Sequence, residues 1–136
     1  MKRVMFAAAL ALLAGCAMND PVDMPATERD RAGLAAALEG YAEAGPPVSC
    51  VNQRDLGGNR SAGEGAIVFQ GRTRDRLWVN RPAGGCPSVD TGRALVTRTP
   101  GTQLCRGDIA TVVDLVSGTQ FGGCGLGDFT PYRRVR

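Results

Sequence analysis

The distribution of the cysteines constrains this chain more than any other feature of its sequence. Cys16 lies near the N-terminus, and the other four, Cys50, Cys86, Cys105 and Cys124, are spread over the last 91 of the 136 residues. Their separations of 36, 19 and 19 residues include no Cys-x-x-Cys pair, and they do not cluster as the ligands of a zinc or iron–sulfur site would. The single cysteine and the group of four therefore need separate explanations.

The N-terminus carries the features of a bacterial lipoprotein signal. Met1-Lys2-Arg3 is basic, Val4 to Leu13 is an apolar run too short to span a bilayer, and Leu13-Ala14-Gly15-Cys16 resembles a lipobox. In bacterial lipoproteins the cysteine thiol receives a diacylglyceryl group and the signal peptide is cut just before it. The resemblance implies that residues 1–15 are a signal peptide and that Cys16 anchors the chain through acyl chains such as palmitate.

The residue after the lipobox cysteine predicts the destination. Ala17 stands where an aspartate would retain the protein in the inner membrane under the sorting rule of enteric bacteria. We therefore expect the cell envelope, with the chain facing the periplasm and the outer membrane favoured over the inner. The alternative is an ordinary secretory signal that is cleaved and contains an incidental cysteine.

The four remaining cysteines predict two disulfides, because their number is even and the periplasm is oxidising. A small domain has a limited core and benefits from such cross-links. Four cysteines allow three pairings, and the sequence does not select one. We favour Cys86–Cys105 together with Cys50–Cys124, the second joining the first strand to the C-terminal end.

Between the lipobox and the domain we predict an acylated flexible tether at 16–26, then a helical segment at 27–45. The helix itself is expected for about 28–44, before a Gly-Pro-Pro sequence. It is amphipathic, with an apolar stripe at helical spacing formed by Leu34, Leu38 and Tyr41. The segment is acidic, which disfavours an anionic membrane surface, so we expect the stripe to dock on the following domain or the helix to form a solvated stalk.

The segment 46–136 is typical of an all-β domain. Short runs of apolar β-forming residues alternate with glycine, proline, asparagine and aspartate every 8–14 residues. We predict a mainly β fold: a small antiparallel barrel or sandwich of five to six short strands, preceded by one amphipathic helix. The predicted strands are Val48–Asp55, Gly65–Gly71, Arg76–Arg81, Ala94–Thr99, Ile109–Val116 and Asp128–Arg133.

Four short motifs around the cysteines resemble a known family. They are Cys50-Val51, Cys86-Pro87, Leu104-Cys105-Arg106-Gly107-Asp108 and Cys124-Gly125-Leu126-Gly127-Asp128-Phe129. In this order they resemble a family of small proteobacterial exported proteins and lipoproteins known only as a domain of unknown function. The resemblance covers about 46–131 and departs from the family pattern at Ser88-Val89. It implies one domain with paired cysteines, and it brings no activity, cofactor or catalytic residue.

The composition excludes several classes of enzyme. The chain has no histidine, and Lys2 is its single lysine. Ser-His-Asp and Cys-His catalysis, histidine-ligated metals, Schiff-base chemistry and a P-loop are therefore ruled out, and we predict no metal and no cofactor. Hydrolysis by paired carboxylates remains open, with candidates at Asp55, Glu64, Asp75, Asp90, Asp108, Asp114 and Asp128.

The charge is uneven along the chain. The segment 17–45 has two arginines and six acidic residues, whereas 46–136 has twelve arginines and seven acidic residues. This excess is too modest and too poor in aromatic residues to indicate a nucleic-acid binder. Arginine suits bidentate contacts with phosphates and carboxylates, so an exposed patch could bind an anionic glycan or lipid; the alternative is a solvated surface. The candidate residues are Arg72, Arg74, Arg76 and Arg81.

Other short features have ordinary structural interpretations. Asp90-Thr91-Gly92 resembles half of an aspartic protease dyad, but a second copy is missing, and a turn explains it. Arg106-Gly107-Asp108 is expected to be a turn, and the glycine-rich segment 122–127 a bulged or closely packed strand. Trp78 is expected to point away from Leu77 and Val79, either as a core residue or as an exposed ligand platform.

These observations favour a non-catalytic cell-envelope lipoprotein, a membrane-anchored periplasmic β-domain with a binding or structural role toward an envelope protein or glycan. The first alternative is a small hydrolase that uses paired carboxylates. The second is an arginine-mediated binder of anionic glycan or lipid.

Overall fold

The computed structural model describes residues 28–89 and 93–136, so Cys16, the predicted signal peptide and the tether lie outside the described residues. Within the described part, one α-helix, one short 3-10 helix and ten strands follow one another along the chain. They are α1 (Glu28–Ala37), β1 (Tyr41–Glu43), β2 (Cys50–Asn52), η1 (Gln53–Asp55), β3 (Leu56–Ser61), β4 (Ile67–Gly71), β5 (Arg76–Asn80), β6 (Arg93–Thr97), β7 (Gln103–Cys105), β8 (Ile109–Asp114), β9 (Gln120–Gly125) and β10 (Phe129–Arg134).

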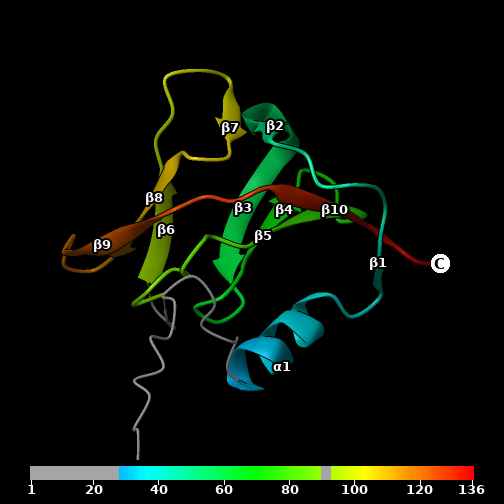
Figure 1. Ribbon diagram of the computed structural model, residues 1–136, viewed down its shortest axis with the longest axis horizontal. Coiled ribbons are helices and arrows are strands. Elements are labelled where there is room, and N and C mark those ends of the chain that lie inside the picture. The colour runs from blue at the N-terminus through cyan, green and yellow to red at the C-terminus, as the bar shows by residue number, and fades with distance from the viewer. Residues whose placement is uncertain (1–27, 90–92) are drawn as a thin grey trace, which may run out of the picture.

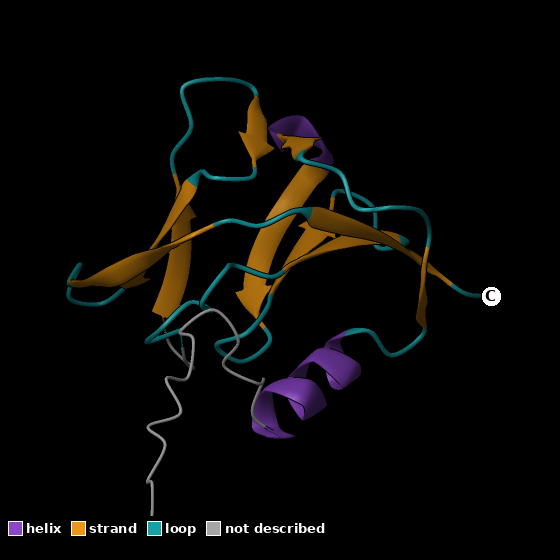
Figure 2. Ribbon diagram, viewed as in Figure 1, coloured by secondary structure: helices purple, strands orange, loops and turns teal. Residues whose placement is uncertain are grey.

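The strands form three antiparallel sheets in the described part of the chain. The largest has the order β1-β10-β5-β4-β3, the second is β6-β8-β9, and β2 pairs with β7 in a third. The first two sheets pack face to face, and α1 lies under the other side of the large sheet (Figure 1, Figure 2). The mainly β fold with one preceding helix is therefore confirmed, and of the two predicted architectures the fold is the sandwich, not a closed barrel.

The strands β4 and β5 lie at the centre because both of their faces are apolar. Side chains alternate between the two faces of a strand. Phe69 and Trp78 pack into the core between the two sheets, together with Leu95, Leu104, Val112 and Phe129. Val68 and Leu77 point the other way, into a second core under α1. Trp78 is thus a core residue, with 8 % of its surface exposed, and its predicted direction away from Leu77 and Val79 is confirmed.

The helix docks on the second core as predicted, but it is shorter than the expected 28–44. Leu34, Leu38 and Tyr41 pack on the buried face of the large sheet. The helix ends at Ala37, because Gly40 takes a positive φ of 77° and the next three residues form β1 beside β10. The Asp30 carboxylate accepts a hydrogen bond of 3.0 Å from the backbone N–H of Glu64, which ties the helix to the β3–β4 loop.

Four strands were not predicted, since their sequences lack an apolar alternation. The strands β1 and β7 have three residues each, β3 is polar, and β9 is rich in glycine. The composition of Gly57-Gly58-Asn59 predicts a turn, but the segment belongs to β3. The register of β3 with β4 shifts between Leu56 and Gly58. The expected first strand at 48–55 is divided into β2 and η1.

All four domain cysteines are paired, which confirms two disulfides, but the predicted pairing is wrong. The bonds are Cys50–Cys105 and Cys86–Cys124, with sequence separations of 55 and 38 residues. Cys50 is joined to Cys105 because β2 pairs with β7, where the two residues are direct register partners, rather than with the C-terminal strand. Each cross-link stabilises the fold by about 4 kcal/mol in the chain-entropy model.

A buried asparagine anchors the connection between β9 and β10. Asn80 at the end of β5 has no exposed surface. Its amide nitrogen donates to the carbonyl of Gly127 at 2.7 Å, and its amide oxygen accepts from the N–H of Gly127 at 2.9 Å. A Cβ atom at Gly127 would collide with the carbonyl oxygen of Arg81, so the close approach needs glycine.

The disulfide pairing predicts which thiols are released by single substitutions. In Cys86→Ser, Cys124 is expected to become a free thiol while Cys50–Cys105 stays intact, because the two bonds share no residue. Alkylation under non-reducing conditions followed by peptide mass spectrometry measures this. Cys50→Ser is the matched control and should free Cys105 instead. Release of Cys105 by Cys86→Ser would contradict the pairing.

The Asn80 junction predicts a large loss of stability on truncation. Asn80→Ala removes two hydrogen bonds and leaves the N–H and carbonyl of Gly127 without this partner, which should lower the free energy of unfolding by about 3 kcal/mol. Urea denaturation of the oxidised protein measures the change. The control Asn59→Ala removes one 3.2 Å bond from an exposed side chain to Leu95 and should cost about 1 kcal/mol or less. Equal losses for both variants would refute the special role of Asn80.

Candidate functional site

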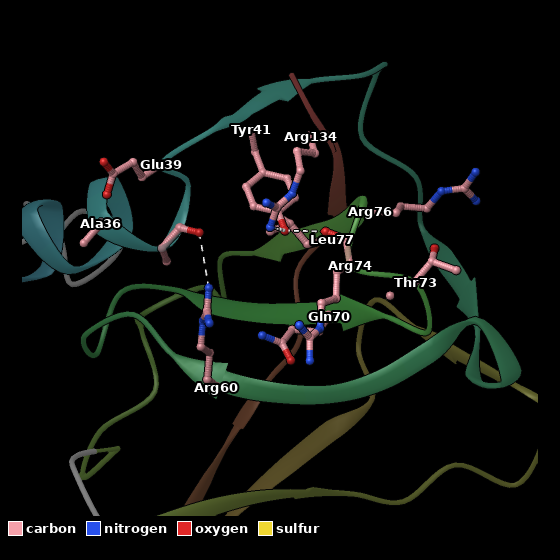
Figure 3. Close-up of a pocket in the computed structure, with 12 residues that line it drawn as sticks. Ala36, Glu39, Tyr41, Arg60, Gln70, Thr73, Arg74, Arg76, Leu77 and Arg134 are labelled. Atoms are coloured by element: carbon pink, nitrogen blue, oxygen red, sulfur yellow. Dashed lines mark hydrogen bonds between the residues drawn. The ribbon is translucent and has the colours of Figure 1, made fainter. Parts of the chain in front are cut away.

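A groove of about 340 Å³ lies between the end of α1 and the large sheet, beside the β4–β5 turn. Four arginines from separate parts of the chain line it, and Glu39 is the one acidic residue on its rim (Figure 3). The arginines are Arg60 from β3, Arg74 from the β4–β5 turn, Arg76 from β5 and Arg134 from β10. The groove is therefore strongly basic.

Tyr41 organises one wall of the groove. Its hydroxyl donates a hydrogen bond of 2.6 Å to the carbonyl of Arg74, and it accepts one of 3.1 Å from Nη2 of Arg134. The Arg134 guanidinium also lies 5.1 Å from the centre of the tyrosine ring, within the range of a cation–π contact. Tyr41 thus fixes the backbone of the β4–β5 turn and holds Arg134 across its ring (Figure 3).

Arg60 forms the opposite wall. Its Nη2 donates a hydrogen bond of 3.2 Å to the carbonyl of Ala37, the last residue of α1. The last turn of α1 has no basic residue of its own, so the guanidinium compensates the negative end of the helix. Arg60 is exposed, and this is the one hydrogen bond of its side chain among the described residues. Its remaining N–H donors are available to a ligand.

The arginines of the groove differ in how far their charge is balanced. Arg76 extends away from the other three in Figure 3, and its charge helps to keep the pKa of Asp75 below its usual range, after the larger contribution of a hydrogen bond from Thr73. Arg60, Arg74 and Arg134 form no ion pair within residues 28–89 and 93–136, whereas Arg31 pairs with Glu28 and Arg106 with Asp128. These three positive charges remain uncompensated in the described structure.

The groove contains half of the predicted arginine patch. Arg74 and Arg76 line it, whereas Arg72 and Arg81 are exposed and lie outside its lining. Sequence reasoning missed Arg60 and Arg134. These two residues come together because β3 and β10 belong to the same sheet, and no spacing in the sequence indicates this.

Several acidic side chains serve to hold turns. The Glu64 carboxylate accepts a bond of 3.3 Å from the N–H of Ser88, and that of Asp108 accepts one of 2.8 Å from the N–H of Cys105. Asp114 accepts bonds from Ser117 and Val116, and these lower its pKa. A general acid for hydrolysis needs a raised pKa. Asp90 of the Asp-Thr-Gly motif lies outside the described residues.

The Arg-Gly-Asp tripeptide and the glycine-rich segment have structural roles. Arg106-Gly107-Asp108 forms the turn between β7 and β8, as predicted, and the carboxylate of Asp108 accepts a hydrogen bond from the backbone N–H of Cys105. The first part of the glycine-rich segment, up to Gly125, belongs to β9, whose register with β8 is irregular, and Leu126 and Gly127 follow that strand. Within the described ranges no group of three or more histidine, cysteine, aspartate or glutamate residues is placed to hold a metal ion.

Comparisons with known proteins do not place the chain in a family. No protein-family model, curated protein or solved structure matches it. The resemblance carried by the cysteine motifs therefore stays a prediction. Among the helices of the described residues, none has the length and apolar character needed to cross a membrane.

The two hydrogen bonds of the Tyr41 hydroxyl predict that its removal destabilises the protein. Tyr41→Phe keeps the ring under Arg134 but removes both hydrogen bonds, so the free energy of unfolding should fall by about 1–2 kcal/mol. Amide exchange in the β4–β5 turn should also become faster, which NMR can follow. Tyr132→Phe is the control, because the Tyr132 hydroxyl forms no hydrogen bond in the described part. An equal effect of both variants would contradict the role of Tyr41.

Proposed function

We propose that the protein is a lipid-anchored lipoprotein of the cell envelope, and that its β-domain is non-catalytic and acts by binding. The observation that supports the anchor is the use of the cysteines. The four domain cysteines are consumed in two disulfides, and Cys16 in the lipobox is the remaining one. The disulfides indicate an oxidising, non-cytoplasmic compartment, which is where lipobox cysteines are acylated.

Acylation of Cys16 would make membrane attachment nearly permanent. Each methylene buried in the bilayer contributes about 0.8 kcal/mol, and two or three acyl chains exceed what a single chain provides. The folded domain would then begin at Glu28, after a tether of eleven residues. The residue Ala17 favours the outer membrane, with the domain on the periplasmic side.

A binding role is supported by the contrast between the arginines and the acidic residues. Arg60, Arg74 and Arg134 face one groove without an acidic partner in the described chain, whereas Glu64, Asp108 and Asp114 bond to backbone N–H groups of turns. Carboxylates engaged in this way are poor general acids, while uncompensated guanidinium groups are ready to receive an anion. This favours the anionic-ligand alternative over paired-carboxylate hydrolysis.

The proposal predicts the effect of one substitution on location. Cys16→Ser should move the protein from the membrane fraction to the soluble periplasmic fraction and abolish labelling by radioactive palmitate, because the acyl chains have no attachment site. Fractionation with a high-salt wash and immunoblotting measures this. Met18→Ser, next to the lipobox, is the control and should stay labelled and membrane-bound. A Cys16→Ser protein that remains in the washed membranes would refute the anchor.

A further inference from the structure

We infer that the arginine groove is a binding site for a phosphate ester, of the kind carried by a glycerophospholipid headgroup. The inference deepens the proposed function and rests on its binding role, since it names the chemical class of the ligand. It is based on three guanidinium groups without an ion-pair partner in the described structure, on the fixed positions of two of them, and on the small apolar part of the lining.

The charge of the groove suits phosphate better than a single carboxylate. Three arginines, Arg60, Arg74 and Arg134, approach from three different strands or turns (Figure 3). A tetrahedral phosphate offers acceptor oxygens in several directions and carries up to two negative charges, so it can use more than one guanidinium. A carboxylate is planar and is satisfied by one bidentate arginine. Glu39 on the rim points away from the arginines (Figure 3).

Two of the three guanidinium groups are held in place before any ligand binds. Arg134 is fixed by the ring and hydroxyl of Tyr41, and Arg60 by the carbonyl of Ala37. Each uses one bond in this way and keeps other N–H donors for a ligand. A site whose donors are already ordered loses less side-chain entropy on binding, which raises affinity.

The size and the rest of the lining limit the carbon part of the ligand. A volume of about 340 Å³ is near the lower end for small-molecule sites, so the ligand is compact. Leu77 and Ala37 provide apolar contacts, and Gln70 and Thr73 provide neutral polar ones. A phosphate joined to a short polyol such as glycerol matches this mixture.

The tether would place the groove within reach of headgroups. From Cys16 to Thr27 the chain spans at most ~40 Å when extended, so the domain would stay close to the bilayer surface. Soluble phosphate esters share the same chemistry, and the experiment separates the two sources.

The test uses the full exported chain with Cys16→Ser, oxidised, so that the acyl anchor does not contribute. Binding of glycerol 1-phosphate is measured by calorimetry and NMR shifts, beside inorganic phosphate and glycerate. We expect the phosphate ester to bind more tightly than glycerate. Arg60→Gln and Arg134→Gln should each weaken binding about tenfold or more, which corresponds to the loss of a charged hydrogen bond. Arg72→Gln and Arg81→Gln, outside the groove, are the matched controls and should change affinity less than twofold.

A second arm measures flotation of the same variants with vesicles of phosphatidylcholine, with and without phosphatidylglycerol. Flotation that requires phosphatidylglycerol and is lost in Arg60→Gln but not in Arg72→Gln identifies the headgroup as the source. Binding of glycerol 1-phosphate without flotation supports the site with a soluble ester. Absence of binding in both arms, equal affinity for glycerate, or equal losses in the control variants would overturn the inference. If the Cys16→Ser protein stays in the membrane fraction while the groove still binds glycerol 1-phosphate, the lipid anchor is refuted and the binding site is not.

Discussion

Burial of the β4–β5 pair on both faces determines where every other layer lies. Phe69 and Trp78 supply one apolar face and Val68 and Leu77 the other, so each face needs a cover. The sheet β6-β8-β9 covers the first and α1 covers the second. A single sheet with two apolar faces must be shielded from water on both sides, and here the helix covers one side and the second sheet the other. The three-layer arrangement follows from two short apolar runs.

The groove exists because the cover on the helix side is incomplete. A helix of ten residues is about 15 Å long, and it ends at Ala37, short of the β4–β5 turn. The chain then turns at Gly40 and returns as β1, which places Tyr41 over the uncovered end of the sheet. Arginines occupy this end, since their long side chains cover apolar surface while the charged groups stay in water. The basic groove is therefore a direct consequence of the early end of the helix.

The sequence predicted those parts of the fold that depend on local apolar pattern. The central runs around Ile67 and Trp78, the docked stripe on the helix and the presence of two disulfides all follow from residue type and spacing. The pairing of Cys50 with Cys105 does not, because it depends on which strands lie side by side. The arginine patch is predicted only in part for the same reason: Arg60 and Arg134 are 74 positions apart and meet through sheet order. Short polar strands such as β3 give no periodic signal at all.

The cross-links and the basic groove lie on opposite sides of the large sheet. Cys86 and Cys124 belong to the core between the two sheets, and Cys50–Cys105 joins β2 and β7, whose Val51 and Leu104 pack into that same core. The groove lies on the other side, where Tyr41, Leu77 and the helix form the second core. The β4–β5 pair and β10 connect the two sides, since Phe129 of β10 packs into the first core and Tyr132 packs against the second. Both described disulfides lie on the side of the first core, so the order of Arg60 and Arg134 depends on packing and on their hydrogen bonds to Ala37 and Tyr41.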